Sequence, residues 1–159
     1  MNILVLCTGN SARSILLEAI LNRLGRARGI TAYSAGSRPA GAVHPQSLRL
    51  LTAKGYDTTG LRSKSWDEFA GTSSPQMDMV ITVCGSAAGE ACPVWPGTPL
   101  RAHWGVEDPA AAAPADQQEA FEAAHARLYR RAEAFVALEP GRLSRAALQT
   151  ELSRVGTIE

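Results

Sequence analysis

A cysteine and an arginine, Cys7 and Arg13, lie close together at the end of the first apolar segment of this 159-residue chain. Residues 2–6 form a short run rich in aliphatic and β-branched side chains, which is typical of a strand buried on both faces. Small and polar residues occupy positions 8–12, and from about Ser11 apolar residues recur at helical spacing. The sequence therefore predicts a strand, a short loop and a helix, with the cysteine where the loop begins and the arginine in the first helical turn.

This arrangement suits nucleophilic chemistry on an oxyanion. A loop that leads from a strand into a helix directs backbone N–H groups into one concavity, and the helix end adds partial positive charge there. We expect these groups and Arg13 to lower the pKa of Cys7 below that of a free thiol, and the Arg13 fork to match two oxygens of the anion. Ser14 can donate a hydrogen bond to the sulfur. The predicted oxyanion-binding residues are Thr8, Gly9, Asn10, Ser11, Ala12, Arg13 and Ser14. The alternative is that Cys7 is a small buried hydrophobe, which the arginine and the loop context disfavour.

Two further cysteines, Cys84 and Cys92, bracket a segment of mostly small residues. Two nearby thiols on such a segment, close to an activated third, predict a relay in which one sulfur takes over a bond from another. The alternative is two unrelated small residues in a loop. The spacing of the three cysteines fits no zinc-binding pattern, so we expect no bound metal.

Asp108, followed by a proline, lies beyond the last predicted strand. It could act as a general acid for a leaving oxygen or as a proton acceptor for a thiol. Alone, such a pair usually marks only a turn. We assign no catalytic role to the histidines, expecting His44 at a helix start, His103 at a strand edge and His125 on an exposed helix face.

Composition restricts the class of protein. With 45% apolar residues, 19% charged residues and a net charge of +1, the chain is expected to be one globular domain, residues 1–159, with no nucleic-acid or membrane partner. No apolar run approaches the length of a membrane span, and no secretory signal is visible. An odd count of three cysteines favours intracellular thiol chemistry, so we expect a cytoplasmic protein.

Strand and helix patterns alternate, which predicts the α/β class: an open, four-stranded parallel sheet with helices on both faces. The expected strands are residues 2–6, 30–35, 77–83 and 101–106, and the expected helices begin near 11, 45, 65, 116 and 143. Residues 140–159 would form an extra C-terminal helical segment. Because ligands of such sheets bind at the carboxyl ends of strands, Cys7 and Cys84 should share one rim.

These residues resemble a known family. The stretch from Cys7 to Ser14, with Asp108 late in the chain, is similar to the low-molecular-weight protein tyrosine phosphatases. Within that fold, residues 33–36, the 83–84 strand end, 91–93 and 103–105 resemble the arsenate reductases. The resemblance covers about residues 2 to 138, and Cys84 and Cys92 favour the reductases over the phosphatases.

The resemblance implies a mechanism. Arsenate would bind in the loop, Cys7 would attack arsenic, and Arg13 would hold the oxygens of the adduct. Cys84 would then attack the Cys7 sulfur and release arsenite, and Cys92 would attack Cys84, leaving a Cys84–Cys92 disulfide for an external thiol reductant. Thioredoxin is the expected reductant, with glutaredoxin or a small thiol as alternatives. Asp108 would assist proton transfer, and no bound cofactor is implied.

Some relatives bind potassium near this loop, and Asn10, Glu18 and Ser34 resemble ligands of that site. Lys64 stands where those relatives carry a carboxylate, so we expect no dependence on potassium. Two other functions stay open from the sequence: a phosphatase acting on phosphoesters, and a non-catalytic module that binds oxyanions or senses thiols.

Overall fold

Four short strands pair in parallel into one open sheet in the computed structural model, which describes residues 1–89 and 95–159. The strands are β1 (Asn2–Cys7), β2 (Thr31–Gly36), β3 (Met79–Thr82) and β4 (Leu100–His103), in the spatial order β2-β1-β3-β4. β1 is central and runs to its end fully buried, because its side chains face the two sides of the sheet alternately and both sides are covered.

The helices follow the strands in the predicted alternation, and the predicted fold class is confirmed. They are α1 (Arg13–Gly25), η1 (Arg26–Arg28), α2 (Pro45–Ala53), η2 (Trp66–Phe69), α3 (Gly85–Gly89), η3 (Pro109–Ala111), α4 (Gln117–Ala137), η4 (Pro140–Arg142) and α5 (Arg145–Val155). α2 begins after His44, whose ring nitrogen accepts from the Gln46 amide, and η2 begins after Ser65, whose hydroxyl accepts from the Asp67 amide. The sequence predicts both helix starts, and it predicts the cap at Ser65, a residue type that commonly caps helices. Across the described residues, none of the helices is both long and apolar enough to cross a membrane.

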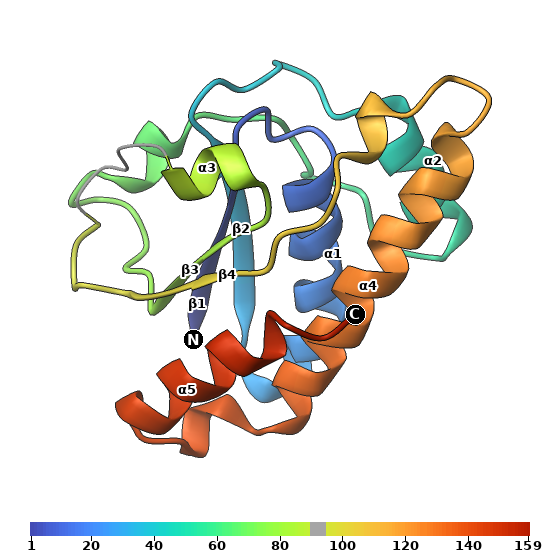
Figure 1. Ribbon diagram of the computed structural model, residues 1–159. Helices are drawn as coiled ribbons and strands as arrows, with labels where there is room; N and C mark the ends of the chain where they lie inside the picture. The colour runs from blue at the N-terminus through green and yellow to red at the C-terminus, as the bar shows by residue number, and fades with distance from the viewer. Residues whose placement is uncertain (90–94) are drawn as a thin grey trace.

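The two faces of the sheet are covered unequally. On one face α1 and α4 pack side by side (Figure 1), and alternate strand residues such as Ile3, Val5 and Ile81 join them in the larger core. On the other face, Leu4, Leu6 and Val80 pack against Phe69 of η2 and Trp95, in a smaller second core. In the part of the chain that the structure describes, this second face carries a 3-10 helix and loops, so its cover is thinner than the predicted layer of helices.

Three expectations about local structure are corrected. β4 ends at His103 and not at residue 106, although the amides of Trp104 and Val106 still donate to the carbonyls of Thr82 and Val83. The segment after Cys84, predicted to be a loop, begins with the one-turn helix α3. His125, predicted on an exposed face, is buried, and its Nε2 lies 3.0 Å from the Tyr56 hydroxyl.

Side-chain amides bind backbone groups on the outer edges of both border strands of the sheet. Asn22 of α1 donates to the Ala32 carbonyl at 3.0 Å and accepts from the Ala32 amide at 2.8 Å, on the outer edge of β2. Gln149 of α5 donates to the Arg101 carbonyl of β4 at 2.8 Å. These contacts satisfy backbone groups that a neighbouring strand would otherwise bind.

Candidate active site

The carbonyl groups of the loop between β1 and α1 accept hydrogen bonds from a neighbouring segment. Backbone amides of residues 38, 40 and 44 donate to the carbonyls of Thr8, Gly9 and Ser11 at 3.0, 2.9 and 3.0 Å. The Gly9 amide, in contrast, points inward and bonds to the sulfur of Cys7. The carbonyls are therefore bonded on the outer side of the loop, which leaves the inner side to N–H groups, as an anion-binding loop requires.

Asn10 fixes the shape of this loop. Its backbone is left-handed, with φ of 45°, a conformation that asparagine tolerates better than most residues. The buried side-chain amide donates to the hydroxyls of Ser14 at 2.8 Å and Ser34 at 2.9 Å, and its oxygen accepts from the Lys64 amide at 2.9 Å. Asn10 thus ties the loop to α1, β2 and the segment before η2.

A glycine lets the loop lie directly against β2. A Cβ placed on Gly36 would be 2.4 Å from the Thr8 carbonyl oxygen, a distance that no real side chain occupies. Gly36 also donates its amide to the Lys64 carbonyl at 2.9 Å. The loop and the end of β2 approach so closely that only a residue without a side chain fits here.

Cys7 and Cys84 lie together at the carboxyl ends of the adjacent strands β1 and β3. Both are buried free cysteines, and the thiol of Cys7 is hydrogen-bonded to the sulfur of Cys84. The Cys84 sulfur also accepts from the Ala87 amide of α3 at 3.4 Å and lies 3.7 Å from the Thr8 hydroxyl. The prediction that two of the three thiols share one rim is confirmed.

The two thiols of this pair shift each other's pKa in opposite directions. The hydrogen bond from Cys7, with those from Ala87 and Thr8, lowers the pKa of Cys84 to about 5. The same hydrogen bond and burial raise the pKa of Cys7, although Arg13 and the Gly9 amide act in the opposite direction. The predicted low pKa of Cys7 is therefore wrong for the reduced pair, because one charge already occupies the adjacent sulfur.

Arg13, the first residue of α1, contacts the chain segment that leads from β4 to Asp108. Its Nη1 donates to the Val106 carbonyl at 3.1 Å, and its Nη2 lies 3.5 Å from Oδ2 of Asp108. Its Nε is buried and has no hydrogen-bond partner among residues 1–89 and 95–159. A buried donor without a partner is costly, so this nitrogen is available to an anion.

Backbone hydrogen bonds hold the three site-bearing segments in register. The Val83 amide donates to the Leu6 carbonyl at 3.0 Å, and the Val106 amide donates to the Val83 carbonyl at 3.1 Å. Since Leu6 precedes Cys7 and Val83 precedes Cys84, these bonds fix the two thiols relative to each other and to the chain that leads to Asp108. The Asp108 carboxylate accepts from the Ala110 amide at 3.1 Å, starts η3 and is 44% exposed, so solvent protons can reach it.

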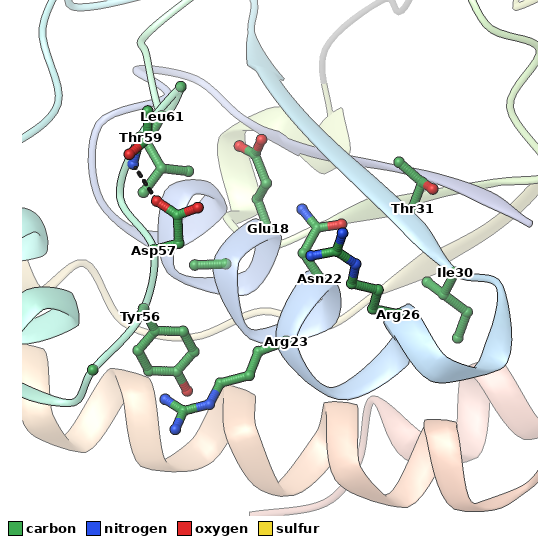
Figure 2. A pocket seen from close by; sticks show the side chains of 13 residues that line it. Glu18, Asn22, Arg23, Arg26, Ile30, Thr31, Tyr56, Asp57, Thr59 and Leu61 are labelled. Carbon is green, nitrogen blue, oxygen red and sulfur yellow. Dashed lines mark hydrogen bonds between the residues drawn. The ribbon is translucent and has the colours of Figure 1, made fainter.

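Behind the loop lies a buried polar cluster that borders a separate cavity of about 580 Å³. Glu18 accepts a hydrogen bond from the Ser34 hydroxyl and lies 3.9 Å from the Lys64 ammonium. Burial raises the pKa of Glu18 and lowers that of Lys64, and each opposes the shift of the other. Figure 2 shows that the Glu18 carboxylate points away from Arg23 and Tyr56, which line the far end of the cavity. The Lys64 ammonium also donates to the Arg62 carbonyl at 3.2 Å, while the Lys64 backbone amide binds Asn10.

Of the residues predicted to act in catalysis, the structure brings Cys7, Arg13, Cys84 and Asp108 together. Cys92 lies outside the described residues. The Ser14 hydroxyl accepts from Asn10, and its contact with the Cys7 sulfur stays a prediction. Among the residues that the structure does describe, no three His, Cys, Asp or Glu side chains are grouped as metal ligands.

Sequence reasoning predicted the backbone amides of the loop but missed the backbone carbonyl that binds Arg13. The carbonyl of Val106 carries no sequence signal, because any residue could supply it. The resemblance pointed to Lys64, which stands where relatives carry a carboxylate. The burial of Arg131 was indicated by its place in the apolar stripe of α4, three residues after Leu128 and four before Phe135.

The comparisons with known proteins agree with this geometry. Residues 2–153 match the family described as low molecular weight phosphotyrosine protein phosphatase. The chain belongs to this family. It is 36% identical over 115 residues to an arsenate reductase of Halalkalibacterium halodurans, covering 72% of this chain and 78% of that protein. It is 34% identical, over the same shares of both chains, to an arsenate reductase of Bacillus subtilis.

Solved structures of family members superpose on most of the chain. An arsenate reductase in a phosphate-binding state has a TM-score of 0.68 at 27% identity, covering 86% of this chain and 97% of that one. A thioredoxin-dependent arsenate reductase of Corynebacterium glutamicum has a TM-score of 0.61 at 25% identity, covering 86% of this chain and 62% of that one. In the present chain, a second thiol lies against the loop, with the Cys84 sulfur 3.7 Å from the Thr8 hydroxyl.

Proposed function

We propose that this protein reduces arsenate to arsenite. Cys7 is the nucleophile, and Cys84 is the thiol that attacks the Cys7 sulfur and so breaks the sulfur–arsenic bond. The observation that carries the proposal is that the buried sulfurs of Cys7 and Cys84 interact at the ends of adjacent strands, beside an Arg13 Nε that has no hydrogen-bond partner among the described residues. A phosphatase of the same fold needs the loop and the arginine but has no use for a second thiol in contact with the first. Relatives named arsenate reductase support the substrate.

The first step forms a bond between sulfur and arsenic. Arsenate binds in the loop between Thr8 and Ser14, with Arg13 holding its oxygens. Cys7 passes its proton to the Cys84 thiolate along the hydrogen bond that joins them, and its thiolate attacks arsenic. One arsenate oxygen leaves as water, with Asp108 supplying a proton. Arsenic is still As(V) in this adduct.

The second step is the reduction. Cys84 loses its proton again and attacks the Cys7 sulfur, so that a Cys7–Cys84 disulfide forms as the sulfur–arsenic bond breaks. The electron pair of that bond stays on arsenic, which leaves as As(III) arsenite, while the two thiols are oxidised by two electrons. Cys92 would then attack Cys84, release Cys7 as a thiol and leave a Cys84–Cys92 disulfide.

An external dithiol must return the protein to its reduced state. We propose thioredoxin, which the named dependence of the Corynebacterium glutamicum neighbour supports, with glutaredoxin or a small thiol as the competing donors. Such donors belong to a reducing compartment, in keeping with the predicted cytoplasmic location.

The test is arsenate-dependent oxidation of NADPH by the purified protein, with thioredoxin and its reductase, or glutaredoxin with glutathione and its reductase, supplied one at a time. We expect turnover with the thioredoxin system. Cys84→Ser should abolish multiple turnover while still allowing one equivalent of adduct on Cys7, detected by mass spectrometry. Unchanged steady-state reduction in Cys84→Ser would rule out the relay.

Phosphoester hydrolysis is the second candidate, because Asp108 lies beside Arg13 as a leaving-group acid would. Hydrolysis of p-nitrophenyl phosphate that survives the double change Cys84→Ser and Cys92→Ser, in a protein that does not reduce arsenate, would favour it. Turnover of either oxyanion would exclude a module that only binds oxyanions or senses thiols.

A further inference from the structure

A buried arginine on α4, Arg131, is hydrogen-bonded at once to the active-site side of the molecule and to its C-terminal segment. The residue is 3% exposed. Its Nη1 donates to the Gly105 carbonyl at 3.1 Å and its Nε donates to the Ile158 carbonyl at 2.8 Å. Since burying a guanidinium is costly unless its donors are bonded, these two carbonyls determine where this side chain lies.

The first carbonyl belongs to the segment that ends in Asp108. Val106, the next residue, donates to the Val83 carbonyl and accepts from Arg13, and Asp108 lies 3.5 Å from the same arginine. The chain from 105 to 108 is therefore held by Arg131 at one end and by Arg13 at the other. A shift at Gly105 would move the carbonyl and the carboxylate that position Arg13.

The second carbonyl belongs to the segment that follows α5, which lies against the same stretch of chain. The indole nitrogen of Trp104 donates to the Leu152 carbonyl at 2.9 Å. Gly156 approaches so closely that a Cβ there would be 2.6 Å from the His103 carbonyl oxygen. The C-terminal segment thus packs on residues 103–105, and Arg131 joins the two.

We propose that Arg131 is a positioning residue for the reaction, acting through Gly105 on the Val106 carbonyl and Asp108, with the Ile158 carbonyl orienting its guanidinium. This inference rests on the proposed function for its kinetic test. It gives the C-terminal helical segment, residues 140–159, a part in catalysis although the segment contributes no residue to the site.

The variants are Arg131→Met, which removes both hydrogen bonds at similar length, and Arg131→Lys, which keeps the charge and one donor. Arg130→Met is the matched control, because Arg130 is exposed and its Nε donates to the backbone oxygen of Glu159 in the same segment. We expect kcat/KM for arsenate to fall on the order of tenfold in Arg131→Met, by less in Arg131→Lys, and by under about twofold in Arg130→Met.

A double-mutant cycle with Asp108→Asn separates positioning from general damage. If Arg131 acts in part through Asp108, Arg131→Met should cost clearly less than tenfold once Asp108 has been changed, because only the effect through the Val106 carbonyl and Arg13 remains. Losses that multiply, so that Arg131→Met costs the same tenfold in both backgrounds, would overturn the proposal.

Hydrogen exchange gives a readout that does not depend on arsenate. The Val106 amide should lose protection in Arg131→Met, while the amides of the β1–β2 pairing keep theirs. If Arg131→Met is too unstable to purify, deletion of residues 157–159 removes the Ile158 partner and should have the same local effect in smaller degree. Unchanged exchange at Val106 in both variants would refute the inference, whereas a wild-type protein inactive on arsenate would refute the proposed function alone.

Discussion

The charge on the thiol pair is the most direct quantity to measure, because the pKa of Cys84 is lowered and that of Cys7 is raised. The largest cause is the hydrogen bond donated by Cys7. Cys7→Ala removes that donor, whereas Cys7→Ser keeps a hydroxyl donor in its place. Both changes are best made with Cys92→Ser, so that Cys84 is the single remaining thiol of the three in the chain.

The size of the effect follows from the two pKa values. At a pKa of about 5, against an ordinary 9.0, Cys84 at pH 7 is roughly 99% thiolate and not roughly 1%. Loss of its largest stabilising contact should raise the pKa of Cys84 toward the ordinary value in Cys7→Ala, and the thiolate fraction at pH 7 can then fall by as much as about 100-fold. In Cys7→Ser the midpoint should stay nearer to 5.

The assay is absorbance at 240 nm, where a thiolate absorbs and a thiol does not, followed from pH 4 to pH 10 and checked by the pH dependence of alkylation. In the Cys92→Ser protein with both other thiols present, one thiolate should appear with a midpoint near 5 and the second only at high pH, because the raised pKa of Cys7 keeps it protonated. A single midpoint close to 9 for Cys84 in this protein, or identical midpoints for Cys7→Ala and Cys7→Ser, would refute the reasoning.

The same shift has a consequence for stability. Because folding lowers the pKa of Cys84, the unfolded chain binds more protons than the folded one between about pH 5 and pH 9. The contribution of Cys84 to the free energy of unfolding is therefore present above the unfolded pKa and is lost as the pH falls toward 5.

Three further predictions concern the loop and the cluster behind it. Arg13→Lys keeps the charge but loses the planar fork and the Nε donor, so kcat/KM for arsenate should fall by about 100-fold or more in steady-state assays; a loss under fivefold would contradict the assigned role. Gly36→Ala places a methyl group 2.4 Å from a backbone oxygen and should lower the free energy of unfolding by about 2 kcal/mol or more in urea titrations, whereas Gly85→Ala, with nothing within 4 Å, should change it by less than about 0.5 kcal/mol. Lys64→Met leaves Glu18 buried without its ion partner, so the free energy of unfolding should drop by about 3 kcal/mol at neutral pH and recover as acid protonates Glu18. In the wild-type protein, exchanging sodium for potassium should leave activity unchanged. A several-fold rise would show that the Lys64 ammonium does not replace the potassium ion.

Much of the fold could be predicted from the sequence because its signals are local. The run before Cys7, the capped helix starts at His44 and Ser65, and the apolar stripe of α4 each depend on residues close together in the chain. Cys7 and Cys84 could be placed on one rim because carboxyl ends of neighbouring parallel strands meet there. Local pattern, topology and site chemistry agree at these points.

What could not be predicted depends on contacts between distant segments. The charge on Cys84 in place of Cys7 arises from a hydrogen bond between residues 77 positions apart in the chain, and propensity carries no information on it. His125 was predicted on an exposed helix face, but Tyr56, far away in the sequence, lies against it, and the histidine is buried. The Val106 carbonyl that orients Arg13 has no residue type to recognise.

The amides of Asn22 and Gln149 also bear on how the protein behaves at high concentration. A sheet whose outermost strands offer bare peptide groups invites strands from other molecules, which is one route to fibrous aggregates. Here a carboxamide binds backbone groups near the start of each border strand, so an incoming chain finds those groups already bonded. Removing either amide side chain would free these groups for a strand from another molecule.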